Sequence, residues 1–145
     1  MAGNREATGL AALRVCLGVF TLADAFFKLR WLINSEGFAT RASEWAKNAN
    51  PWNTGFLHHV VLPYVAILSR VVLIGEVCVG LGLLLGIFTR PLAIIAFLMV
   101  LVFQFATGTL FHPELFVRDG LGLPLLGGLL ALAIGAGRLP WSLKS

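Results

Sequence analysis

Four long apolar stretches constrain the fold of this 145-residue chain more than any other feature. They cover about residues 10–33, 62–88, 91–108 and 119–136. Each has roughly 18 or more residues, enough for a helix to cross a hydrocarbon core of about 30 Å. None shows the alternation of apolar and polar residues that is typical of a half-buried strand. We therefore expect an all-α integral membrane protein whose four antiparallel helices form a four-helix bundle.

The composition agrees with a lipid environment. Hydrophobic residues make up 58% of the chain and charged residues only 12%, against about 25% charged residues in soluble proteins. The formal net charge of +4 comes from single, scattered basic residues and not from a cluster. We therefore expect one transmembrane domain over residues 1–145, in contact with the lipid bilayer and not with nucleic acid.

The basic residues outside the apolar stretches favour one orientation in the membrane. One face is expected to hold both termini and the turn between the second and third helices, with Arg5, Arg90, Arg138 and Lys144. The other face would carry the 34–57 segment and the His112 loop, where Arg41, Lys47 and Arg118 oppose this assignment. The positive-inside rule makes the first face the cytoplasmic one.

The segment 34–53 is the longest polar stretch. Phe38, Ala42, Trp45 and Ala49 recur in it at helical spacing, with polar residues between them. This pattern predicts a short amphipathic helix in the headgroup region, anchored by Trp45; the alternative is a surface loop. Residues 110–118 are expected to form a second short loop.

Six polar residues within the first three apolar stretches are candidates for intramembrane contacts. They are Arg14, Asp24, Lys28, Arg70, Glu76 and Gln104. Estimated depths place Asp24, Arg70 and Gln104 at a similar level. Because an unpaired charge in hydrocarbon is costly, we expect Asp24 to pair with Arg70, and Glu76 to contact Lys28, Gln104 or water.

These residues have two interpretations. They can be a structural network that sets which helices pack together, or they can line a polar site for a small ligand, a quinone head group or a proton. In the second case Glu76 is the candidate catalytic residue, because a carboxyl group near mid-membrane could take up a proton when a quinone is reduced. Arg14, Asp24, Lys28, Arg70 and Gln104 are then the candidate binding residues. No spacing typical of metal or haem ligands is present, so we expect no metal.

Several sequence blocks resemble the DoxX-like membrane proteins, a family that includes the small subunit of thiosulfate:quinone oxidoreductase. The most specific block is a glutamate followed by a glycine–leucine run and Thr-Arg. The matching positions are Leu13-Arg14, Gly18, Phe27-Lys28-Leu29, Asn50-Pro51-Trp52, Leu62-Pro63, Gly75-Glu76, Gly80 to Gly86, Thr89-Arg90, Arg118-Asp119, Gly127, Gly135 and Trp141-Ser142-Leu143. The family often has an aspartate after this last block, where the chain has Lys144.

The resemblance implies a four-helix, multi-pass protein of the bacterial cytoplasmic (inner) membrane. It suggests a membrane subunit of a quinone-linked oxidoreductase system, in sulfur or thiosulfate oxidation, that anchors other protein subunits. The alternative is a non-catalytic accessory or anchoring subunit of a larger membrane complex. A small-molecule carrier is disfavoured, because four short helices leave little room for alternating access.

Overall fold

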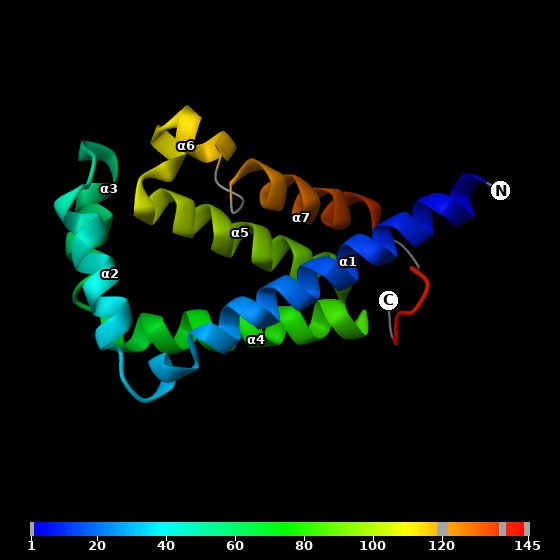
Figure 1. Ribbon diagram of the computed structural model, residues 1–145, viewed down its shortest axis with the longest axis horizontal. Coiled ribbons are helices and arrows are strands. Elements are labelled where there is room, and N and C mark those ends of the chain that lie inside the picture. The colour runs from blue at the N-terminus through cyan, green and yellow to red at the C-terminus, as the bar shows by residue number, and fades with distance from the viewer. Residues whose placement is uncertain (1, 119–121, 137–138, 144–145) are drawn as a thin grey trace.

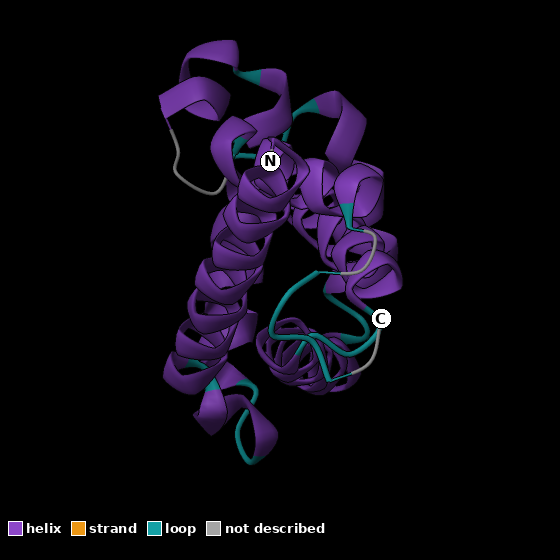
Figure 2. Ribbon diagram, turned by 90° about the vertical axis from the view of Figure 1, so that its right-hand side faces the viewer, coloured by secondary structure: helices purple, strands orange, loops and turns teal. Residues whose placement is uncertain are grey.

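The computed structural model describes residues 2–118, 122–136 and 139–143, and all regular structure in these residues is helical (Figure 2). The elements follow one another along the chain as α1 (Ala2–Phe27), η1 (Leu29–Leu32), α2 (Glu36–Lys47), α3 (Pro51–Phe56), η2 (Leu57–Val61), α4 (Val65–Leu85), α5 (Thr89–Thr107), η3 (Thr109–Phe111), α6 (Pro113–Arg118) and α7 (Leu123–Gly135). The prediction of an all-α chain is confirmed.

Three of these helices are long and apolar enough to cross a membrane. They are α1 over Arg5–Phe27, α4 and α5. A third or less of each apolar window is buried inside the protein, and large side chains such as Phe27 and Ile67 lie exposed on its outside. Outward-facing apolar side chains on helices of this length are suited to contact with lipid.

The fourth predicted span is shorter than expected. The helix α7 has 13 residues, which at ~1.5 Å per residue is about 20 Å long. The beginning of the predicted 119–136 helix, at Asp119, lies outside the described residues.

Other predicted boundaries shift for local reasons. The first helix begins earlier than residue 10 and ends at Phe27, and a short 3₁₀ turn continues it. The second begins at Val65 and not at residue 62. The helical segment η2 precedes it and Leu62 still has helical backbone angles, but Pro63 lacks the N–H donor that would continue the helix. The predicted loop over 110–118 is wrong: η3 and α6 occupy it, and Pro113 stands at the first position of α6, where a proline costs no hydrogen bond.

Helices α1 and α4 make the most extensive contact in the molecule. Two glycines allow it. A Cβ atom on Gly18 would lie 2.8 Å from the backbone nitrogen of Leu84 and 3.1 Å from the carbonyl oxygen of Gly80. A Cβ on Gly80 would lie 2.7 Å from Cγ of Leu22. Small residues at such points let two helix backbones approach closely in lipid, where packing drives helix association.

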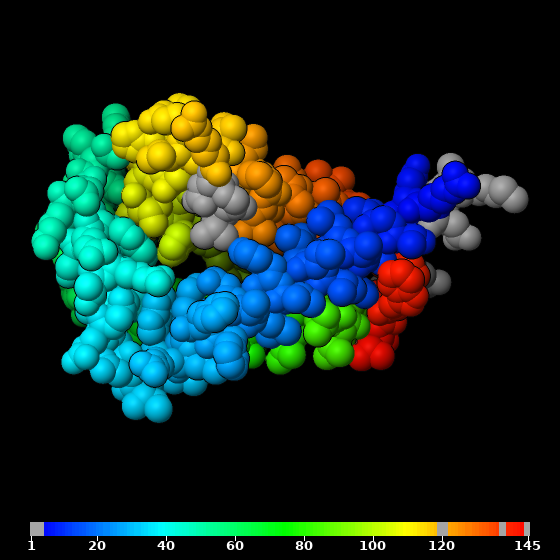
Figure 3. Space-filling model, viewed as in Figure 1, coloured from blue at the N-terminus to red at the C-terminus, as the bar shows by residue number. Residues whose placement is uncertain are grey.

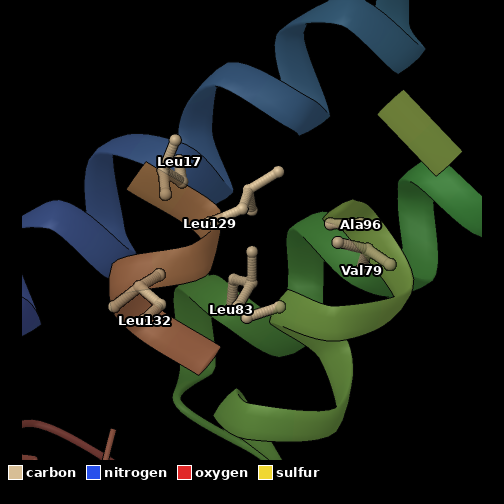
Figure 4. Close-up of a cluster of buried hydrophobic side chains, with 7 residues drawn as sticks. Leu17, Val79, Leu83, Ala96, Leu129 and Leu132 are labelled. Carbon is tan, nitrogen blue, oxygen red and sulfur yellow. The ribbon is translucent and has the colours of Figure 1, made fainter. Parts of the chain in front are cut away.

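One buried apolar cluster joins α1, α4, α5 and α7 (Figure 4). Its members are Leu17, Val79, Leu83, Ala93, Ala96, Leu129 and Leu132. Each of the four helices contributes at least one side chain, so α7 packs with the three longer helices despite its length.

The segment after α1 closes one end of the molecule. The predicted helix is present as α2, and its apolar residues Phe38 and Ala42 are buried against Leu57, Val61 and Ala106. Trp45, expected as the membrane anchor, packs edge-on against Phe103 with ring centroids 5.3 Å apart. The apolar face of α2 therefore packs on the protein.

The two ends of the molecule carry different segments. The start of α1, residues 139–143 and the α4–α5 turn lie at one end, and α2, α3 and α6 lie at the other (Figure 1). This is the arrangement that the sequence predicts. Arg138 and Lys144, which enter the predicted orientation, lie outside the described residues.

The close approach of α1 and α4 can be tested by adding a single methyl group. We expect Gly18→Ala to lower the free energy of unfolding by about 1–3 kcal/mol, because the new Cβ overlaps the backbone of α4. Gly127→Ala is the matched control, since a Cβ there meets no atom within 4 Å. Thermal unfolding in detergent micelles measures both; equal melting temperatures would contradict the proposed tight contact.

Candidate functional site

A cluster of three charged side chains connects α1 to α4. The Nζ atom of Lys28 lies 2.5 Å from Oδ2 of Asp24 and 2.6 Å from Oε1 of Glu76. The side chains of Lys28 and Glu76 are 11% and 12% exposed, whereas that of Asp24 is 41% exposed. The ammonium group is therefore neutralised by two carboxylates in a largely water-free position.

The local sequence places these groups together. Asp24 lies in the last turn of α1 and Lys28 directly follows that helix, so the spacing of four residues brings the two side chains together. Glu76 reaches the same point from α4, which the Gly18–Gly80 contact holds close to α1. Of the three partners that the sequence left open for Glu76, the structure shows Lys28. The predicted Asp24–Arg70 pair is wrong, because Asp24 pairs with Lys28 and the Arg70 Nε donates to the carbonyl oxygen of Leu32 at 3.2 Å.

The charged cluster forms part of the wall of a cavity of about 470 Å³. Helices α1, α2, α4 and α5 supply most of its lining, and Figure 3 shows the surface hollowed between α1, α2 and α5. Most lining side chains are apolar. The aromatic ones are Phe20, Trp31, Phe38, Trp45, Phe56 and Phe103. The cavity therefore combines an aromatic wall with one ionic group.

A second cation lies on the cavity wall at Arg41. Its Cζ atom lies 5.7 Å from the ring centroid of Trp31, and Lys28 Nζ lies 5.5 Å from the same centroid. Among the described residues Arg41 has no carboxylate partner. The sequence predicts Arg41 among the polar residues of the amphipathic helix; its position four residues before the cavity-lining Trp45 is the available indication of its place on the wall.

Three predicted site residues lie outside the cavity lining. Arg14 is fully buried and donates from Nη1 to Ser142 Oγ at 2.5 Å and from Nη2 to the carbonyl oxygen of Trp141 at 2.9 Å. Arg70 caps the turn after α1, as described above. Gln104 is fully buried in α5. The expectation that these residues share one polar interior with Asp24, Lys28 and Glu76 is therefore wrong for Arg14 and Arg70, and Gln104 is absent from the wall.

The chemistry of the cluster follows from its charges. With both carboxylates ionised, two negative groups surround one ammonium, so the cluster carries one excess negative charge and has the capacity to bind one proton. Carboxylates accept hydrogen bonds and the guanidinium of Arg41 donates them. The wall can thus contact two polar groups of a flat, mostly apolar ligand. Within the described part of the chain, no group of three His, Cys, Asp or Glu residues could hold a metal ion.

The family follows from comparison with known protein families. The family model DoxX matches residues 9–109, a range that includes Asp24, Lys28, Arg41 and Glu76. The chain belongs to the DoxX family. Comparison with curated proteins and with solved structures returned no match. With its three long apolar helices, this DoxX protein is a multi-pass membrane protein.

Removal of the central ammonium tests the balance of charge in the cluster. We expect Lys28→Met to lower the free energy of unfolding by about 3 kcal/mol, since it leaves two carboxylates without their partner in a poorly hydrated position. The triple variant Lys28→Met/Asp24→Asn/Glu76→Gln removes those charges as well and should recover most of the loss. Chemical unfolding in micelles measures both, and a triple variant no more stable than Lys28→Met would contradict the charge argument.

Proposed function

We propose that this DoxX protein is a membrane subunit of a quinone-linked oxidoreductase system and that its cavity binds the quinone head group. The observation that carries the proposal is the aromatic cavity with the Lys28 cluster in its wall. Its volume falls within the ~300–1,000 Å³ range of small-molecule sites, which are mostly apolar with a few placed polar groups. A quinone combines the same two features, a flat apolar ring and a few polar oxygens.

The charged cluster would handle the proton that accompanies quinone chemistry. Reduction of a quinone to a quinol requires two electrons and two protons, and a carboxylate near the ring can exchange a proton with it. Glu76 and Asp24 are the groups proposed for this role, and Lys28 holds both of them in place. The electrons would come from a partner subunit that oxidises a sulfur compound such as thiosulfate.

The same proposal includes a position in the bacterial cytoplasmic membrane. There α1, α4, α5 and α7 would act as a four-helix bundle, with α7 crossing the membrane together with adjoining residues. The helix α2 would lie at the membrane surface while its apolar face covers the cavity. The positive-inside rule places both termini in the cytoplasm.

This orientation can be measured by labelling an introduced thiol. In a Ser145→Cys variant with Cys16 and Cys78 replaced by serine, the new thiol is the single cysteine of the chain. We expect a membrane-impermeant maleimide added to spheroplasts to leave it unlabelled, and to label it after the membrane is opened. Labelling in intact spheroplasts would reverse the proposed orientation.

Quinone binding can be followed by tryptophan fluorescence, because two of the four tryptophans, Trp31 and Trp45, line the cavity. Trp52 and Trp141 are exposed on the outside. In nanodiscs, a Trp52→Phe/Trp141→Phe variant should be quenched by a short-chain naphthoquinone with a saturable dependence on concentration. The reason is that a bound ring lies against Trp31 or Trp45.

The matched control is Trp31→Phe/Trp45→Phe, whose remaining tryptophans face outside the cavity. Its quenching should rise without saturation, as for a quinone dissolved in the lipid. Unsaturable quenching in both variants would show that the cavity holds no quinone. Recovery of a stable complex with other subunits would then favour the alternative of an accessory or anchoring subunit.

A further inference from the structure

On the basis of this quinone site, we propose that the cavity prefers the reduced, hydroxyl-bearing quinol over the oxidised quinone, and that Asp24 accepts the hydrogen bond of its O–H group. In this hydrogen bond Glu76 is a positioning residue that acts through Lys28, and its proposed part in proton exchange is a separate role. The sequence predicts Glu76 as the catalytic residue; the geometry points to Asp24 as the group that the ligand contacts.

The exposure of the three charged side chains differs along the cluster. Asp24 is 41% exposed, whereas Lys28 and Glu76 are 11% and 12% exposed, although all three line the cavity. A ligand entering the cavity therefore meets the Asp24 carboxylate more readily than the two groups beneath it.

The individual oxygen atoms also indicate that Asp24, and not Glu76, faces a ligand. Lys28 donates to Oδ2 of Asp24, and the Asp24 side chain stays 41% exposed. The second oxygen of Glu76, Oε2, is buried beyond the reach of solvent. The Asp24 carboxylate is thus the acceptor that a ligand can reach, while Glu76 contributes Oε1 to the Lys28 ammonium.

The chemistry of this acceptor selects one redox form. An ionised carboxylate accepts hydrogen bonds and donates none. A quinol presents an O–H donor to it, whereas a quinone presents a carbonyl oxygen that is itself an acceptor. Two carboxylates already engage the ammonium of Lys28, so the exposed side of the cluster is negative. Arg41, whose Cζ lies 5.7 Å from the Trp31 ring centroid, is a donor for the second oxygen of the ring in either form.

Three ligands with the same ring and tail distinguish the effect of the O–H group on binding from the effect of ring shape. They are the quinol, the quinone and the dimethyl ether of the quinol, which keeps the ring but has no O–H. Dissociation constants come from the ligand dependence of the melting temperature in nanodiscs under anaerobic conditions. We expect the wild-type protein to bind the quinol at least about tenfold more tightly than the other two, as one hydrogen bond to a charged acceptor provides.

Two isosteric variants of the cluster then assign the preference to one carboxylate. In Asp24→Asn the amide can donate as well as accept, so the preference for quinol should fall to about twofold or less. In Glu76→Gln the preference should persist, even if both forms bind more weakly, because Asp24 still faces the ligand. Asp24→Glu should retain the preference, since it retains a carboxylate. If Asp24→Asn does not fold, Asp24→Thr provides a smaller neutral side chain for the same comparison.

The outcomes separate this inference from the proposed function. Binding of all three ligands with similar affinity, or tighter binding of the quinone, overturns the quinol preference and leaves the quinone site in place. Loss of the preference in Glu76→Gln but not in Asp24→Asn overturns the assignment to Asp24. Failure of every ligand to bind the wild-type protein removes the proposed function itself.

Discussion

The contact between Lys28 and its two carboxylates is the interaction on which the rest of this structure depends. It joins α1 to α4 at the point where α1 ends, beside the cavity. A charged group in this environment is stable only with a partner, and each member of the cluster supplies the partner for another. The close backbone contact at Gly18 and Gly80 brings the two helices near enough for Glu76 to reach Lys28. The contact between α1 and α4 therefore requires both the close packing of the two helices and the pairing of their charges.

Three arginines meet the same requirement in another way, by donating to backbone carbonyl oxygens. Arg70 contacts Leu32 and Arg90 contacts Ala133 and Ile134, in each case near the end of a helical segment, where intrahelical partners are lacking. Arg14 contacts Trp141 in the segment after α7. None of these three side chains lines the cavity. Among the described residues, the charged groups of the cavity wall are therefore the Lys28 cluster and Arg41.

The sequence was sufficient for the helical class and for three long apolar helices, and it included Lys28 among three possible partners of Glu76. It was insufficient for the partner of Asp24, because depth along the membrane normal does not give the direction in which a side chain points around its helix. The four-residue spacing of Asp24 and Lys28 was the better guide. The cavity was beyond prediction for a different reason. It forms only when α2 folds back over α1, α4 and α5, which brings Arg41, Trp45 and Phe103 together from distant parts of the chain.

The opening and the lining of the cavity also bear on what occupies it. The cavity is open to the surface of the protein (Figure 3), so lipid chains or a ligand can enter it in the membrane. Lipid chains match its aromatic side chains but offer nothing to Asp24 or Arg41, whose open hydrogen-bonding capacity favours an occupant with a flat apolar body and polar oxygens.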